Sequence, residues 1–313
     1  MIELRIMLAD TMLALGYILG YFKVRCVSEI ASKLLLYVII PYLMVHGILS
    51  VSSSLIFNTA LIITFYLLFS AITLPLLYNR IYSDLRLKAS ATLSSIIQNV
   101  GFIPIPLMTI LYNNPLPAIV YSLIFNLGSS LLIPFVGKPS ANARELILNI
   151  LKFPLALTSI IAITLKVSTY YLVGIPTLAN PLLTWAAKFM SDASILSFLI
   201  IGDVLANIKF NFSKSVIPIV LWRIAISPLI HLIPLLLIKL PKLWFVGVIL
   251  ESLMPPATMN IVYARFYGLR EDIVTLSIIC TTPISLIASP IIKLLISWNI
   301  SYGLGRGCYE EHI

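Results

Sequence analysis

The sequence predicts an all-helical protein that is integral to a membrane and crosses it ten times. Of its 313 residues, 60% are hydrophobic and only 11% are charged, whereas a soluble domain carries about 25% charged residues. So few charges cannot cover a water-exposed surface. Apolar segments long enough to span a hydrocarbon core, about 20 residues each, recur along the chain. Basic residues also gather at alternate connections between these segments, as a fixed membrane orientation requires.

Ten apolar segments are predicted to be membrane-spanning helices. In order along the chain they are Leu4–Phe22, Ala31–Ser50, Ile56–Tyr78, Ala89–Tyr112, Leu116–Val136, Leu146–Leu165, Leu182–Ala206, Ser215–Ile238, Leu243–Phe266 and Ile273–Trp298. The first segment holds Asp10, and no small-residue cleavage site follows it. We therefore interpret it as a retained span rather than a signal peptide.

The basic residues predict the orientation of the chain. Most of the 21 lysines and arginines lie beside the connections that follow the first, third, fifth, seventh and ninth spans. The positive-inside rule makes this side cytoplasmic, so both termini are expected on the extracellular side of the cell membrane. The same pattern accounts for the formal charge of +9. No run of Lys and Arg marks a nucleic-acid surface, and no nucleic-acid partner is expected.

A hydrophilic stretch at residues 137–145 divides the chain into two halves of five spans. We expect a first five-helix repeat at 1–140, a second at 141–300 and a polar tail at 301–313. Because five is an odd number, the second half enters the membrane from the opposite side, which is the arrangement of an inverted repeat. The fourth and ninth spans are then structural counterparts.

The fourth span is interrupted near its middle by polar and helix-breaking residues. Gln98 and Asn99 are followed by Pro104 and Pro106, and proline removes a backbone donor and clashes with the preceding turn. In a bilayer such a break is tolerated only where it is buried in protein or lines a watery cavity. At 1.5 Å per residue, Asn99 lies about 15 Å into its span, near the midplane of a core about 30 Å thick.

The ninth span repeats this pattern, with two prolines about 18 Å into it and an asparagine shortly after them. Interrupted segments at corresponding positions of two halves indicate the binding site of a transporter. A half-helix N-terminus at such a break carries roughly half a positive charge, which suits a carboxylate. The predicted substrate-binding residues are Asn99, Gln98, Asn260, Pro106, Pro255 and Pro256, and the predicted helix-breaking residues are Pro104, Pro106, Pro255 and Pro256.

Each of these residues also has a structural interpretation. The amides of Gln98, Asn99 and Asn260 either bind the substrate or its coupling ion, or they satisfy backbone groups that a helix break leaves free. The prolines shape the site in either case.

Four further polar residues within the spans are candidates for coupling or for lining the substrate path. Glu251 lies one turn before the ninth-span break and either carries a coupling proton or is a structural partner of Arg223. Asp192 either lines the path or neutralises Lys188, four residues before it. Asn126 lies in the middle of the fifth span, where we expect it behind the residues that contact the substrate.

The remaining sequence features exclude other classes of site. The three cysteines are far apart in the chain and form neither a disulfide framework nor a metal-binding spacing. The sequence has no phosphate-binding loop, zinc-binding helix motif or nucleophile elbow, so neither a cofactor nor a metal is expected. An intramembrane enzyme that uses paired carboxylates is a remote alternative, because no spacing typical of a protease or transferase is present. A channel is a further alternative, although channels do not need paired midplane breaks.

Three groups of residues carry a likeness to a known family. They are Ala14–Gly20 with Leu36–Pro41, Asn99–Phe102 with Pro106, and Met254–Ala257 with Asn260 and Ala264–Gly268. Through them the chain resembles the auxin efflux carrier family, which includes plant auxin exporters and prokaryotic permeases. The sequence departs from the family pattern at three places: Pro104 is an additional proline, Ser194 and Ile195 stand near where a proline is common, and Glu251 stands where a small residue is usual. The long central loop of the plant members is also missing.

The resemblance implies ten helices in two inverted five-helix repeats. It also implies a scaffold domain from spans 1, 2, 6 and 7 and a transport domain from spans 3–5 and 8–10, with the broken fourth and ninth helices crossing. The expected function is that of a secondary, elevator-type carrier acting in efflux of small organic anions such as auxin-like carboxylates. The alternative is a proton- or sodium-coupled permease for dicarboxylates of the malonate or malate type. The expected partners are membrane lipid, the anion, protons or sodium, and a second copy in a homodimer.

Overall fold

The computed structural model is all-helical over the residues that it describes, which are 2–24, 26–137, 153–171, 181–206 and 213–301. Seven of its helices are long and apolar enough to cross a membrane. They are Glu3–Tyr21, Cys26–Ser50, Ser53–Ile81, Leu116–Val136, Pro181–Ala206, Lys214–Leu237 and Glu271–Leu295. The expectation of an all-helical membrane protein is therefore confirmed.

The helical segments follow the apolar pattern of the sequence, and several spans are built from more than one helical piece. The pieces are α1 (Ile2–Tyr21), α2 (Cys26–Leu34), η1 (Leu35–Ile39), α3 (Ile40–Ser50), α4 (Ser53–Ile81), α5 (Leu85–Ile96), α6 (Pro104–Tyr112), α7 (Leu116–Gly137), α9 (Pro154–Tyr171), α10 (Pro181–Ala193), η2 (Ser194–Leu196), α11 (Ser197–Ala206), η3 (Lys214–Val216), α12 (Ile217–Leu221), η4 (Trp222–Ile226), α13 (Ser227–Leu237), α14 (Lys242–Ser252), α15 (Met259–Phe266) and α16 (Glu271–Ser301).

Three of the ten predicted spans are not among the seven long helices. Two of them are split, into α5 with α6 and into α14 with α15, so that no single piece has the length of a span. The third corresponds to α9, which is shorter within the described residues. The predicted boundary between the repeats falls almost entirely on residues 138–152, and the predicted polar tail almost entirely on residues 302–313, which both lie outside the described residues. The division into two repeats therefore stays a prediction.

The two split segments are interrupted where the sequence places its prolines and amides. The first helix ends at Ile96 and resumes at Pro104, and the second ends at Ser252 and resumes at Met259. Pro104 occupies the first position of α6, where proline is tolerated because the missing N–H has no partner within the helix. Each interruption therefore leaves one half-helix C-terminus and one half-helix N-terminus inside the protein.

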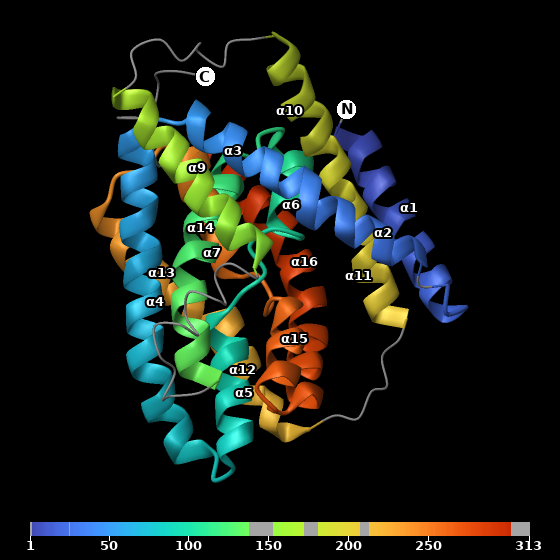
Figure 1. The fold of residues 1–313 in the computed structure, drawn as a ribbon, viewed down its shortest axis with the longest axis vertical. Helices are drawn as coiled ribbons and strands as arrows, with labels where there is room; N and C mark the ends of the chain where they lie inside the picture. The colour runs from blue at the N-terminus through green and yellow to red at the C-terminus, as the bar shows by residue number, and fades with distance from the viewer. Residues whose placement is uncertain (1, 25, 138–152, 172–180, 207–212, 302–313) are drawn as a thin grey trace.

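A tightly packed helix pair forms one side of the molecule, where α1 runs beside α11 (Figure 1). Glycines allow this close approach: a Cβ at Gly16 would collide with the backbone carbonyl of Leu199, and one at Gly202 with that of Leu13. Small residues at helix contacts are typical of membrane proteins, in which helices associate by close packing. The pair thus forms one rigid element.

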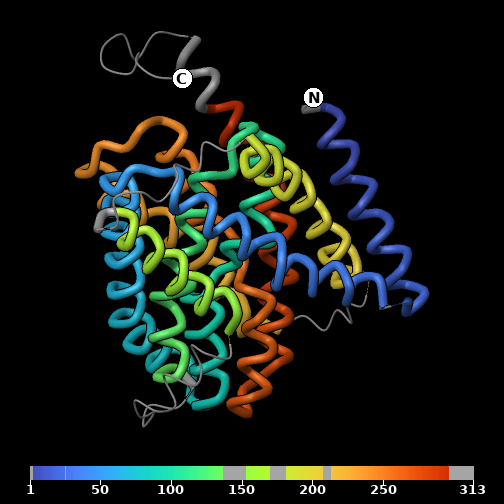
Figure 2. The backbone as a smooth tube through the Cα atoms, turned by 45° about the horizontal axis from the view of Figure 1, so that its top comes forward, coloured from blue at the N-terminus to red at the C-terminus, as the bar shows by residue number. Residues whose placement is uncertain are grey.

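The largest hydrophobic cluster lies away from this pair, among α4, α5, α7, α12, α13 and α14. A smaller cluster joins α1 and α11 to α6 through Ala9, Phe198 and Leu107, among others. The interrupted helices are therefore packed between the α1–α11 pair and the larger bundle. Figure 2 shows the start of α1 and the end of α16 toward the same end of the molecule.

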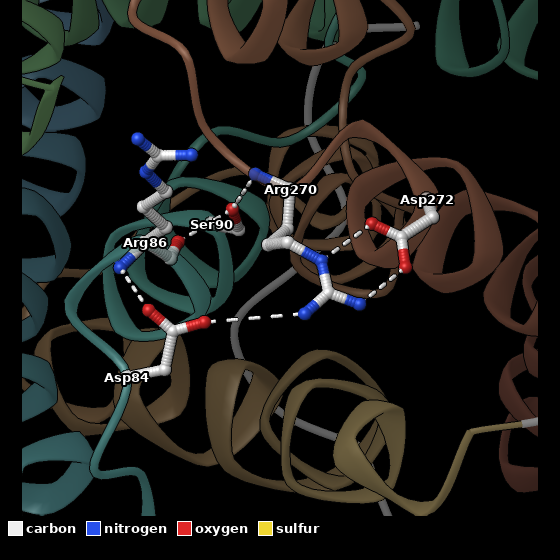
Figure 3. Close-up of polar contacts among 5 residues, drawn as sticks. All are labelled: Asp84, Arg86, Ser90, Arg270 and Asp272. Atoms are coloured by element: carbon white, nitrogen blue, oxygen red, sulfur yellow. Dashed lines mark hydrogen bonds and ion pairs between the residues drawn. The ribbon is translucent and has the colours of Figure 1, made fainter.

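A polar cluster at the opposite end fixes the starts of α5 and α16 to each other (Figure 3). Asp84 accepts a hydrogen bond from the backbone N–H of Arg86 (2.9 Å) and so caps α5. The backbone N–H of Arg270 donates to Ser90 Oγ (2.8 Å). The Arg270 guanidinium lies 2.7 Å from Asp272 and 3.9 Å from Asp84. One interrupted segment is thereby anchored to the last helix.

Candidate functional site

The two interruptions cross and pair with each other through their backbones. Gln98 and Pro256 form an isolated antiparallel β-bridge. The N–H of Asn99 donates to Pro255 O (2.8 Å), and the N–H of Ala257 donates to Ile97 O (2.9 Å). Gln98 and Pro256 are far apart in the sequence, so this pairing is a tertiary contact that holds the two split segments together at one point.

Gln98 and Asn99 point in different directions from this bridge, because successive side chains of an extended segment lie on opposite sides. Gln98 donates a hydrogen bond to Tyr121 Oη (2.9 Å) and accepts one from Arg223 (2.7 Å). It is almost completely buried. These contacts agree with a structural role for Gln98, in which its amide links groups around the helix break, rather than with substrate binding.

Asn99 faces a small cavity. Its Oδ1 accepts a hydrogen bond from the backbone N–H of Phe102 (3.0 Å). Its Nδ2 donates to no residue that the structure describes. Asn99 therefore caps the break with one end of its amide and keeps a donor for the cavity with the other.

Asn260 is fully buried and binds the opposite segment. Its Nδ2 donates to Ile97 O (2.8 Å), the carbonyl that also accepts from Ala257. Its Oδ1 is buried without a hydrogen-bond partner among the described residues. Asn260 does not line the cavity, so its contacts hold the crossing together.

Arg223, on η4, is fully buried against the crossing. Its Nε and Nη2 donate to Met254 O at 2.9 and 2.6 Å. The other acceptors of its N–H groups are Ser252 O (3.2 Å), Ser95 O (3.3 Å), Gln98 Oε1 (2.7 Å), Tyr66 Oη (2.7 Å) and Ser227 Oγ (3.3 Å). The three backbone carbonyls among these acceptors lie at or just beyond the C-terminal ends of α5 and α14.

Glu251 is fully buried near the end of α14, close enough to Arg223 and Tyr121 for electrostatic interaction. Neither of its carboxylate oxygens has a hydrogen-bond partner in the described part of the chain. The direct pairing of Glu251 with Arg223 that the sequence left open is thus not formed, because the guanidinium donates to backbone carbonyls instead. Burial of a carboxylate without a partner is energetically costly. In a membrane protein such a residue is a candidate for a functional role.

Each half-helix N-terminus at the crossing keeps few backbone donors for an anion. In α6 both Pro104 and Pro106 lack an N–H, so that Ile105 is left as the donor in the first three positions. In α15 no proline interrupts the first turn, which begins at Met259. The N–H groups of Asn260 and Ile261 already donate to Ala257 O (3.0 Å) and Thr258 O (3.1 Å), so that Met259 is left as the donor in the first three positions.

The cavity lies between the crossing, α11 and α16, and has a volume of about 20 Å³. That is room for a water molecule but not for an organic anion. Its lining residues are Asn99, Phe102, Ile103, Ser197, Ile200, Ile201, Val204, Leu205, Thr258, Ile278, Ile279 and Thr282. The lining contains no acidic side chain, and most of it is apolar.

Three of the polar lining residues, Ser197, Thr258 and Thr282, were not predicted from the sequence. Ser197 is buried with no hydrogen-bond partner for its Oγ among the described residues, and Thr258 precedes the first residue of α15. Serine and threonine in membrane helices commonly bond to the carbonyl one turn earlier, as Thr282 does with Ile278 O (2.7 Å). No sequence pattern therefore distinguishes these lining residues from the other serines and threonines in the spans.

Asp192 and Asn126 lie away from the cavity lining. Asp192 forms an ion pair of 2.7 Å with Arg5 on α1, rather than with Lys188. Arg5 also donates to Thr109 O (3.1 Å) and Asn113 Oδ1 (2.5 Å) at the end of α6. Asn126 donates to Ser122 Oγ (3.2 Å) within α7. Both residues have structural partners in this conformation.

No protein-family model matches the chain, and no curated protein sequence matches it. Among the described residues, no group of three or more His, Cys, Asp or Glu side chains is arranged to hold a metal ion. The candidate site is the cavity beside the crossing, where Asn99 and Thr258 from the two interruptions are polar lining residues.

Proposed function

We propose that this protein is a secondary carrier for small organic anions, similar to the auxin efflux carriers, and that the anion binds where the two interrupted helices cross. The observation that carries the proposal is the backbone pairing of the two breaks beside a cavity lined by Asn99. Broken helices at corresponding positions of two repeats are the usual construction of a transporter site. The half-helix N-terminus of α15 and the free donor of Asn99 supply positive ends for a carboxylate.

The proposal includes ten spans in two inverted repeats. Successive segments run in alternating directions through the molecule (Figure 1), and the split segments cross in antiparallel orientation. Both features support such a repeat. A cell-membrane location with both termini on the extracellular side, and assembly as a homodimer, belong to the same proposal.

The carrier is proposed to move by an elevator mechanism, in which one domain shifts against the other. The glycine-packed α1–α11 pair belongs to the scaffold, and the bundle around the crossing belongs to the transport domain. The cavity lies at the boundary between these two units. Its small volume in this conformation supports a mechanism in which the site enlarges when the domains shift.

The lining of the cavity favours one substrate class within the proposal. Its walls are mostly Ile, Val, Leu and Phe side chains, and its four polar residues include Asn99 and Thr258 at the crossing. Such a site suits an anion with one carboxylate and an apolar body. A dicarboxylate would place a second charge against apolar walls, which is costly. An auxin-like carboxylate is therefore preferred over malonate or malate.

The test is uptake of labelled anions into vesicles that contain the purified protein. Labelled indole-3-acetate is expected to enter saturably and to be competed by other aromatic carboxylates more strongly than by malonate or malate. Preferential competition by the dicarboxylates would favour the permease alternative. Anion currents that do not saturate would identify a channel, and the appearance of a chemically altered product would identify an enzyme. Either the channel result or the enzyme result would overturn the carrier proposal.

Proton coupling through Glu251 makes a separate prediction. Glu251→Gln keeps the shape of the side chain but cannot exchange a proton, so accumulation driven by a pH gradient is expected to fall about tenfold or more. Exchange of labelled for unlabelled anion needs no coupling and is expected to persist. The measurement compares both assays in the same vesicles, with Glu271→Gln, at a partly exposed position outside the crossing, as the control. Undiminished pH-driven accumulation by Glu251→Gln would contradict this role.

A further inference from the structure

Two half-helix C-termini meet at the crossing. The helix α5 ends at Ile96 and α14 ends at Ser252, and the last carbonyls of a helix have no partner within it. Each such end carries roughly half a negative charge. Together the two ends place about one negative charge inside the protein, and this charge requires a cation.

In carriers with broken helices, unwound carbonyls and half-helix C-termini coordinate the coupling Na⁺ or H⁺. In this chain the carbonyls at that position already have a cationic partner. The guanidinium of Arg223 donates to Ser95 O at the end of α5, and to Ser252 O and Met254 O at and beyond the end of α14. It thus contacts the C-terminal ends of both half-helices at once.

The remaining contacts of Arg223 complete its hydrogen bonding. A guanidinium has five N–H groups, and Gln98, Tyr66 and Ser227 accept those that do not reach carbonyls. The side chain is fully buried. The buried carboxylate of Glu251 has no hydrogen bond to it. The charge of Arg223 is therefore balanced by the two helix ends rather than by an ion pair.

We infer that Arg223 is a tethered cation that replaces a bound alkali cation at the crossing, so that this protein takes up no sodium there. As a statement about transport, this inference rests on the proposed carrier function. Of the two coupling ions considered for that carrier, protons and sodium, it excludes sodium. The occupancy of the cation position by Arg223 does not depend on transport, and it is tested without a transported substrate.

The first experiment measures the thermal unfolding of the purified wild-type protein in NaCl, KCl and N-methylglucamine chloride at equal ionic strength. A ligand that binds only the folded state raises the melting temperature in proportion to the logarithm of its concentration. The melting temperature is expected to be the same in all three salts. A concentration-dependent rise that is specific to sodium would show a sodium site and overturn the inference.

The second experiment restores the missing cation chemically. Arg223→Ala is expected to melt at a lower temperature than wild type, and millimolar guanidinium chloride is expected to raise its melting temperature toward that of wild type. KCl at the same concentration is expected to have no such effect. Arg265→Ala, which removes an exposed arginine, is the control and is expected not to respond to guanidinium.

The outcomes of the two experiments are distinct from those of the uptake assay. If Arg223→Ala folds and guanidinium stabilises it no more than it stabilises Arg265→Ala, the inference is wrong. If Arg223→Ala does not fold, Arg223→Lys keeps a cation with fewer donors, and the wild-type salt comparison still decides. Sodium-independent stability together with no anion uptake would refute the carrier function while leaving the role of Arg223 intact.

Discussion

Replacing Arg223 by methionine is expected to lower the free energy of unfolding by about 3–5 kcal/mol, the usual cost of removing one partner from a buried charged network. Methionine fills much of the volume but donates no hydrogen bond. Met254 O would then lose both of its arginine donors, and the other accepting groups would each lose one. Buried backbone groups without partners are costly, and more so in a membrane protein, where water cannot replace the lost donor.

The measurement is unfolding in mixed micelles at increasing fractions of a denaturing detergent. Arg265→Met is the matched control, because Arg265 has a side chain that is 74% exposed and forms an ion pair with Glu271. Exposed pairs contribute about 1 kcal/mol or less, so its effect is expected to be small. Equal effects of the two substitutions would contradict the assignment of Arg223 to the crossing.

Replacing Asn99 by alanine is expected to reduce anion uptake about 10- to 100-fold. A hydrogen bond to a charged group contributes about 1.5–3 kcal/mol, and each 1.4 kcal/mol corresponds to a factor of ten in affinity. The substitution removes the Nδ2 donor that faces the cavity, and it also removes the acceptor for the Phe102 N–H. The uptake assay measures the effect as an increase in KM.

Asn99→Asp separates these two contributions. Aspartate keeps an oxygen that can accept from the Phe102 N–H but places a second oxygen where the free donor was. The crossing is expected to stay intact, whereas an anion would be repelled, so uptake should fall further than in Asn99→Ala without a comparable loss of thermal stability. Wild-type uptake by Asn99→Asp would show that the anion binds elsewhere. Asn260→Ala is expected to reduce stability instead, since Asn260 binds Ile97 O and not the cavity.

The positions of the helix breaks could be predicted because their cause is local. Proline removes a donor and clashes with the preceding turn wherever it stands, so Pro104, Pro106, Pro255 and Pro256 mark interruptions in the sequence itself. The hydrogen bonds between the breaks are not marked in this way. They join backbone groups, such as Asn99 N and Pro255 O, that every residue carries, and no pattern of side chains distinguishes them.

The roles of adjacent polar residues also depended on the backbone between them. Gln98 and Asn99 are neighbours with similar chemistry, and the sequence assigns both to the substrate. In the structure the extended backbone turns Gln98 toward Arg223 and Asn99 toward the cavity. The partners of Arg223 could not be predicted for a related reason: carbonyls at helix ends attract a cation, but the sequence displays only the carboxylate of Glu251.

Ion pairs between residues far apart in the sequence could not be predicted either. Spacing within one helix favours Lys188 as the partner of Asp192, but the tertiary fold brings Arg5 to it from α1. This contact joins the α1–α11 side of the molecule to the end of α6, which also accepts from Arg5. Such contacts follow from how helices pack, and a single sequence does not encode them in a readable pattern.

The most direct test of the central claim is protection of a cysteine at Thr258 by the transported anion. In a protein whose Cys26, Cys280 and Cys308 are replaced by serine, Thr258→Cys is labelled with a small thiol reagent in the presence of increasing indole-3-acetate. Ser83→Cys, on the exposed connection before α5, is the control. Labelling at position 258 is expected to fall as the anion saturates, while labelling at 83 stays constant. Unchanged labelling at 258 under conditions of saturated uptake would contradict an anion site at the crossing.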